Sequence, residues 1–288
     1  MAKVDNNTLK DGCDLVRRCS VDCQEEQRSQ HERECKPKAA ATPRDDVLFR
    51  QPERSHLGDC PICLLPLSLD TKKSMMQSCC SKLICIGCYY SSIKCEVEKR
   101  IDKSTCPFCR QPFPANGKEI EVYKMRRTQV NDPVAILEAG KRCYHDGDYE
   151  RAFEYFTKVA ELGDAEAEAH YCLSFMYRDG KGVERNVTKR LYHLEKAAIG
   201  GHPKARHNLG VHEVSQGRIE RAVKHFIIAA KNGHDDSIKA LREFYGAGRV
   251  SREDFASALR AYKAFADSTK SPQRDAAEAV LMQIQGRV

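Results

Sequence analysis

The segment from residue 60 to residue 109 contains Cys60-Pro-Ile-Cys63, Cys79-Cys80, Cys85-Ile-Gly-Cys88 and Cys106-Pro-Phe-Cys109. Its four cysteine pairs supply eight thiols, and a Cys-x-x-Cys turn can aim two sulfurs at one metal ion with little distortion. Two tetrahedral zinc ions need eight ligands, and no histidine lies within the stretch. We therefore expect two structural zinc ions in closed sites, with no position left for water or substrate.

The spacing alone allows two ways of sharing these pairs between two ions. In a cross-brace, the first and third pairs hold one ion and the second and fourth hold the other. In a tandem arrangement, consecutive pairs form two separate ribbons. The neighbours Cys79 and Cys80 must splay apart to reach one ion in either case.

This pattern resembles the RING family, in its all-cysteine variant. The resemblance implies a cross-brace with one ion on Cys60, Cys63, Cys85 and Cys88 and the other on Cys79, Cys80, Cys106 and Cys109. It also implies a ubiquitin-protein ligase without a catalytic nucleophile, which binds a ubiquitin-conjugating enzyme and holds its ubiquitin thioester in a reactive pose. Ile62 and Pro107 match the family's docking groove, and Arg110 matches its basic residue after the last ligand. Ser92 stands where the family often has Trp or an aliphatic residue.

Downstream of the finger, apolar residues recur in three columns at helical spacing. The columns are Phe153, Leu191, Val223 and Leu259; Phe156, Leu194, Phe226 and Tyr262; and Ala160, Ala198, Ala230 and Ala266. Within each copy the positions are i, i+3 and i+7, which lie on one face of a helix. Gly163, Gly201 and Gly233 follow the alanine column by three residues, where a helix often ends in a left-handed residue. The pattern predicts four helix–turn–helix units in an all-α solenoid.

The repeated units also resemble a known family. Tyr177-Arg-Asp-Gly-Lys-Gly-Val183 followed by Lys196-Ala-Ala198, and Ala205-Arg-His-Asn-Leu-Gly210, look like Sel-one-like repeats, which are related to tetratricopeptide repeats. The family's tryptophan in the second helix is replaced by Tyr155, His193, His225 and Ala261. The resemblance implies a solenoid that binds proteins.

Composition divides the chain into five segments. We expect a disordered arm (1–55), the finger (56–115), a basic linker helix (116–130), the repeats (131–270) and a C-terminal tail (271–288). Within the arm, Val47-Leu48-Phe49 is a short apolar anchor. The formal net charge of +7 is spread along the chain without a basic block, so nucleic-acid binding is not favoured. The absence of an apolar leader or a membrane-length apolar run predicts a soluble, intracellular protein without a membrane partner, cytoplasmic or nuclear.

The remaining cysteines and histidines are interpreted without a catalytic role. The sequence marks no oriented Cys/His pair for a hydrolase. Cys95, Cys143 and Cys172 lie in predicted helices and are expected to be small buried residues. A third metal site is conceivable on Cys13, Cys19, Cys23, His31 and Cys35, but their spacing is irregular. His202 and His234 occupy equivalent turns and are expected to cap helices.

The leading hypothesis is a ubiquitin ligase whose solenoid binds a protein substrate or an adaptor. The alternative is a non-catalytic, zinc-binding scaffold for protein–protein interaction, in which the finger is a folding unit or a dimer contact. A finger associated with nucleic acid is a weaker third hypothesis.

Overall fold

The finger contains very little regular structure. The computed structural model describes residues 43–100, 104–162 and 166–285, beginning with the short helix α3 (Pro43–Leu48). The finger follows with η2 (Thr71–Lys73), β1 (Ser74–Met76), β2 (Leu83–Cys85) and α4 (Ile86–Glu98). The two strands pair antiparallel, with Met75 opposite Ile84. Strands of three residues cannot stabilise a fold by themselves, so other interactions must hold the finger together.

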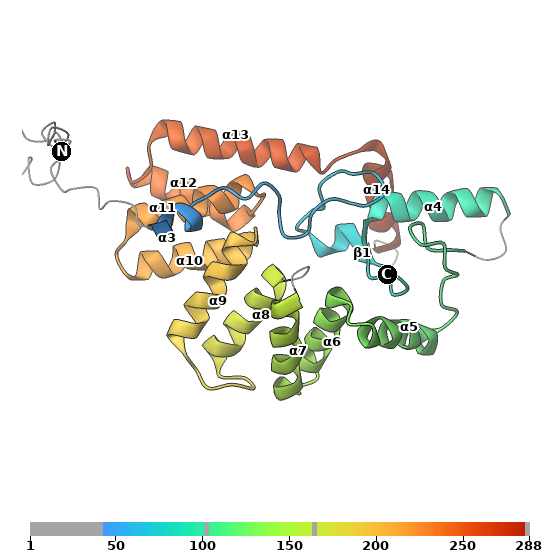
Figure 1. The fold of residues 1–288 in the computed structure, drawn as a ribbon. Helices are drawn as coiled ribbons and strands as arrows, with labels where there is room; N and C mark the ends of the chain where they lie inside the picture. Colours follow the sequence, from blue (N-terminus) through green and yellow to red (C-terminus); the bar gives the residue numbers. More distant parts are fainter. Residues whose placement is uncertain (1–42, 101–103, 163–165, 286–288) are drawn as a thin grey trace, which may run out of the picture. The chain divides into compact units, whose positions relative to one another are not determined.

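The rest of the chain is helical (Figure 1). The helices are α5 (Gly117–Gln129), α6 (Pro133–His145), α7 (Tyr149–Leu162), α8 (Glu166–Asp179), α9 (Val187–Ile199), α10 (Pro203–Ser215), α11 (Ile219–Lys231), α12 (Asp235–Gly246), α13 (Arg252–Ser268) and α14 (Pro272–Gln285). From α6 to α13 each helix packs against the next one in the chain, as in a solenoid of helix pairs. The predicted solenoid is confirmed, and α5 lies where the sequence predicts a linker helix.

The predicted apolar columns form the inside of the solenoid. Phe156, Leu194 and Phe226 are almost completely buried at equivalent places in successive pairs. Two helical glycines let the paired helices approach: a Cβ atom on Gly140 would lie 2.7 Å from the Phe156 ring, and one on Gly210 would lie 2.6 Å from the Phe226 ring. Small residues at these crossings are therefore a requirement of the packing.

The ends of the helices agree with the predicted turns. Gly201 and Gly233 have φ of +83° and +82°, the left-handed conformation in which glycine is least strained. Gly163 lies outside the described residues. His202 is the N-cap of α10, where its Nδ1 accepts a hydrogen bond from the backbone N–H of Ala205. His234 is the N-cap of α12, although its ring contacts the Ser237 hydroxyl instead of a backbone N–H.

The chain before the finger packs along the repeats. Most of the predicted arm, residues 1–42, lies outside the described residues. Leu48, in the predicted apolar anchor, is buried among residues of α9 and α10. The guanidinium of Arg206 donates hydrogen bonds to the backbone oxygens of Leu48 and Ala198. The amide of Gln51 donates to Asn232, so several contacts tie this segment to the repeats.

The segment predicted as a C-terminal tail contains α14, which packs against α4 of the finger. Figure 1 shows these two helices side by side although they come from opposite ends of the described chain. Lys73 of the finger and Glu278 of α14 form an ion pair at 2.9 Å. The finger is thus built on a helix that follows the repeats, as well as on its own residues.

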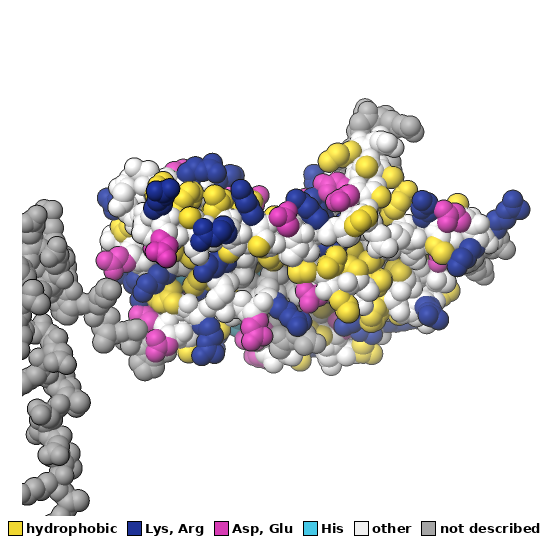
Figure 2. All heavy atoms as spheres, turned by 90° about the horizontal axis from the view of Figure 1, so that it is seen from above, with side chains coloured by type: hydrophobic (Ala, Val, Ile, Leu, Met, Phe, Trp, Pro, Cys, Tyr) yellow, Lys and Arg dark blue, Asp and Glu magenta, His cyan; other side chains and the backbone are white. Residues whose placement is uncertain are grey.

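The surface shows no division into regions of one charge on the face in Figure 2. Lysine and arginine side chains alternate there with aspartate and glutamate. Among the described helices, none is long and apolar enough to cross a membrane.

Candidate metal centre

The first and last Cys-x-x-Cys turns, which we call the first knuckle (Cys60 to Cys63) and the last knuckle (Cys106 to Cys109), have the same backbone geometry. In the first, the N–H of Leu64 donates to the Cys60 oxygen at 2.9 Å; in the last, Arg110 donates to Cys106 at 2.9 Å. Leu64 and Arg110 both have a left-handed backbone, with φ of +58° and +61°. This conformation is uncommon for residues other than glycine, and here it turns the chain back after the second cysteine. This conformation could not be predicted from the residue types, because neither residue is Gly or Asn.

The third cysteine pair lies where a strand passes into a helix. Cys85 ends β2 and is the N-cap of α4, and its sulfur accepts a hydrogen bond from the Cys88 N–H at 3.4 Å. The N–H of Cys85 donates to the sulfur of Cys60 at 3.5 Å. These contacts hold the third pair against the first pair, 25 residues earlier in the chain.

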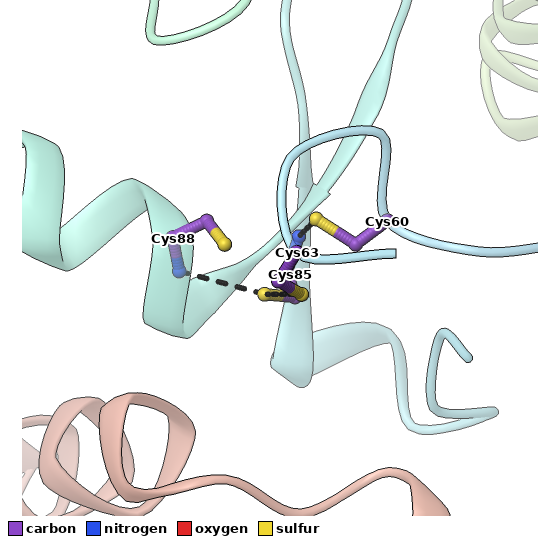
Figure 3. A group of neighbouring side chains, drawn as sticks. All are labelled: Cys60, Cys63, Cys85 and Cys88. Atoms are coloured by element: carbon purple, nitrogen blue, oxygen red, sulfur yellow. Dashed lines mark hydrogen bonds between the residues drawn. The ribbon is translucent and has the colours of Figure 1, made fainter. Parts of the chain in front are cut away.

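Four cysteines converge in what we call site one, formed by Cys60, Cys63, Cys85 and Cys88. Their sulfurs all lie within 4.8 Å of one another, and Figure 3 shows them brought together from the first knuckle and the start of α4. The Cys63 and Cys85 sulfurs are 3.8 Å apart. A tetrahedron of sulfurs about 2.3 Å from a zinc ion has edges of about 3.8 Å, so this spacing fits zinc.

Site two is formed by Cys79, Cys80, Cys106 and Cys109, again within 4.8 Å. The sulfurs of Cys80 and Cys106 are 3.9 Å apart, and those of Cys79 and Cys109 are 3.3 Å apart. The expected cross-brace is confirmed by this grouping, and the tandem arrangement is wrong.

A tight turn allows the adjacent cysteines of site two to reach one centre. The N–H groups of Cys80 and Ser81 both donate to the Gln77 oxygen, and Ser81 is left-handed with φ of +57°. On the other side, the N–H and hydroxyl of Thr105 donate to the carboxylate of Glu96. Glu96 lies on α4, so that helix links the two sites.

Burial makes three of these thiols hard to ionise without a cation. It raises the pKa of Cys80 to about 11 and that of Cys88 to about 12, and it also raises the pKa of Cys79. Every described cysteine is a free thiol. A divalent cation would stabilise four thiolates in each site, and its binding would release their protons. Both groups can therefore bind zinc.

The residues assigned to enzyme docking lie on the surface of the finger. Ile62 is 40% exposed on the first knuckle, and Arg110 is exposed at the end of the last one. Pro107 is half-buried between the two cysteines of that last knuckle. Phe108, which the sequence analysis did not consider, is 42% exposed beside it. The sequence could have indicated Phe108 only as a large apolar residue between two metal-binding cysteines.

A further group with metal-binding side chains lies outside the finger. The ligand atoms of His56, Glu168 and His202 are within 4.8 Å of one another. The Nδ1 of His202 accepts a hydrogen bond from a backbone N–H, so it carries no proton. The proton of the neutral ring is therefore on Nε2, which lies 2.9 Å from a carboxylate oxygen of Glu168. That nitrogen cannot bind a metal while it carries the proton. We interpret this group as a polar contact between His56, at the start of the finger segment, and the repeats.

The other cysteines follow the expectation in part. Cys143 and Cys172 pack at the edge of the first apolar cluster of the repeats. Cys95 is exposed on α4, so the expectation that it is buried was wrong: it lies on the side of the helix away from the finger's core. The N-terminal candidates from Cys13 to Cys35 lie outside the described residues.

Comparison with known proteins identifies the helical region. The family model "Sel1 repeat" matches residues 133–164, 165–202 and 203–234. The chain carries three Sel1 repeats. The pair α12 and α13 continues the stack beyond the last match, in the place of the predicted fourth unit.

Two solved structures with Sel1 repeats are similar to the chain. The Sel1 repeat protein from Oxalobacter formigenes is 24% identical, with a TM-score of 0.44 over 54% of this chain and 66% of that chain. The protective antigen c5321 of uropathogenic Escherichia coli strains, which displays an SLR fold, is 27% identical, with a TM-score of 0.42 over 55% and 34% of the chains.

Another similarity is to the "Putative RING finger protein ORF96" of Ostreid herpesvirus 1 (isolate France), which is 36% identical over 61 residues. The match covers 20% of this chain and a quarter of the viral protein. Together with the two cysteine groups, the family model and this viral relative indicate a repeat protein with a cysteine-rich finger suited to zinc.

Proposed function

We propose that the protein is a RING-type ubiquitin-protein ligase. The observation that carries the proposal is the cross-braced grouping of eight cysteines, with Ile62 and Phe108 exposed on the first and last knuckles. In this proposal each site binds one structural zinc ion, which supplies rigidity and takes no part in the chemistry. Metal analysis of the full chain should give two zinc ions, and one or none would contradict the proposal.

The finger's own residues would act by positioning. Ile62 offers an apolar contact for a ubiquitin-conjugating enzyme, and Pro107 stiffens the knuckle on the other side of the groove. Arg110 has a fixed, left-handed backbone beside the last ligand, so its side chain projects from a rigid point. A cation held there can contact the junction of ubiquitin and enzyme. Holding a thioester in a reactive pose lowers the entropic part of the barrier without a nucleophile.

The repeats would bind the protein substrate or an adaptor. Tyr192 on α9 and Val211 on α10 are about half exposed, and these helices pack against each other. Exposed tyrosine and aliphatic side chains are suited to a protein partner.

The test is single-turnover discharge of a ubiquitin-charged conjugating enzyme onto free lysine. Ile62→Ala should weaken docking of the enzyme by about 1–3 kcal/mol, since it removes an aliphatic contact. Val97→Ala, another exposed aliphatic residue of the finger, is the matched control and should behave like the parent.

Arg110→Ala should slow discharge with little change in docking, because its contacts belong to the reactive pose. Arg110→Lys keeps the charge and should retain part of the rate. If the zinc-loaded parent accelerates discharge with no enzyme of a broad panel, the ligase function is wrong and the scaffold alternative stands.

A further inference from the structure

The strongest unexplained contact of the finger comes from the helix after the repeats. Arg274, on α14, is only 8% exposed. Its Nη2 donates to the Cys63 sulfur at 3.3 Å and to the Leu65 oxygen at 3.1 Å. Its Nη1 donates to the Pro66 oxygen at 2.7 Å and to the Thr269 oxygen at 2.8 Å. One guanidinium thus connects the first knuckle with the end of α13.

The surrounding structure holds Arg274 in this place. The Ser271 hydroxyl accepts the backbone N–H of Arg274 in the first turn of α14. On the finger side, Gly87 lies directly against Arg274: a Cβ atom on Gly87 would be 2.7 Å from the backbone nitrogen of Arg274. The glycine inside the third cysteine pair therefore gives α14 the room to reach site one.

We propose that Arg274 is a positioning residue for the metal of site one, acting through the sulfur of Cys63. This inference rests on the proposed function insofar as site one must bind zinc. A zinc ion with four thiolates has a net charge of −2, and a charge-assisted hydrogen bond reduces the electron density on the sulfur that accepts it. The same guanidinium fixes the knuckle through the Leu65 and Pro66 oxygens. Partners of this kind commonly change metal affinity by 10–100-fold.

Site two offers an internal comparison. Cys109 is the second cysteine of the last knuckle, as Cys63 is of the first, and both are partly exposed. Among the described contacts of the site-two sulfurs, none comes from a lysine or arginine side chain. The backbone turns are alike, and the hydrogen bond from Arg274 distinguishes Cys63 from Cys109.

The experiment uses the full, zinc-loaded chain and measures alkylation of each cysteine by N-ethylmaleimide with peptide mass spectrometry. In Arg274→Gln, Cys63 should react roughly tenfold faster, as a sulfur that has lost this hydrogen bond becomes more nucleophilic and its zinc is held less well. Cys109 should react as in the parent. A general loss of stability would instead accelerate both cysteines.

Two further variants complete the test. Arg274→Lys keeps the charge but cannot make four planar contacts, so its Cys63 rate should fall between those of the parent and the glutamine variant. If Arg274→Gln does not fold, the lysine variant tests the proposal: the ratio of the Cys63 alkylation rate to the Cys109 alkylation rate should be higher than in the parent. Arg260→Gln, at an exposed position of α13, is the control.

The outcomes separate this inference from the proposed function. A parent with two zinc ions and equal effects on Cys63 and Cys109 in the Arg274 variants would overturn the inference alone. A parent that binds no zinc in site one would overturn the zinc-binding part of the proposed function.

Discussion

The finger and the repeats are stabilised by different means within one chain. The buried cluster of the finger is Cys60, Leu67, Ile84, Cys85 and Cys88, so most of it consists of thiols. The cluster around Phe226 in the repeats contains only aliphatic and aromatic side chains. The first kind of core needs a cation to bring its ligands together, whereas the second is stabilised by apolar burial alone. The two regions should therefore respond to different perturbations, except where α14 joins them.

Removal of metal should produce the largest difference. A strong chelator should unfold the finger, because the metal–thiolate bonds that hold its four cysteine pairs together are lost and its three-residue strands cannot replace them. The helices α6 to α13 should remain folded, since their apolar clusters contain none of the eight cysteines. Hydrogen exchange followed by mass spectrometry can measure both regions at once. Loss of protection in α10 and α11 together with the finger would show that the two cores are not independent.

A charged side chain placed inside the repeats should destabilise the repeats, whereas metal removal should unfold the finger. Leu209 is buried beside Leu194 and Ala198, so Leu209→Asp should destabilise the repeats by at least about 3 kcal/mol. Val211→Asp, on the same helix but half exposed, is the matched control. Denaturant unfolding followed by circular dichroism checks the difference. Equal stability of the two variants would mean that the helical register is wrong.

Acid should also weaken the repeats, through buried histidines. Burial lowers the pKa of His202 to about 4, from an ordinary value of about 6.5. The unfolded chain therefore binds more protons between these values, and stability is lost as the pH falls through this window. For His202 the loss between pH 7 and pH 5 is on the order of 2 kcal/mol.

The variant His202→Asn isolates this effect from the acid release of zinc. It should be less stable than the parent at pH 7, because the contact with Glu168 is lost. It should then lose less stability than the parent between pH 7 and pH 5. The same pH dependence in both proteins would exclude His202 as a cause.

The smallest expected effect concerns the close approach of helices. Gly210→Ala places a methyl group against the Phe226 ring and should cost about 1–3 kcal/mol despite the better helix propensity of alanine. Gly246→Ala adds a methyl group where the surroundings are open and should be neutral or slightly stabilising. Thermal unfolding of both variants distinguishes the two sites. A neutral Gly210→Ala would show that α10 and α11 can move apart.

The features that depend on residue spacing can be predicted from the amino-acid sequence. Cysteines three residues apart can aim two sulfurs at one metal ion, and a helical face repeats every 3.6 residues. The solenoid, its inward-facing columns and the zinc-suited cysteine set could therefore be predicted. The choice of the cross-brace over the tandem ribbon came from family resemblance, because spacing within a pair says nothing about which pairs meet.

The contacts that join the regions are visible only in the folded chain. Arg274 and Pro66 are 208 residues apart, and Arg206 and Leu48 are 158 residues apart. The position of such an arginine in the sequence does not distinguish it from a solvated surface residue. What distinguishes it is that the terminal nitrogens of a buried guanidinium must find acceptors, and those acceptors are backbone oxygens and a sulfur brought near only by folding. Local spacing thus specified each core, while the satisfaction of buried polar groups specified the contact between them.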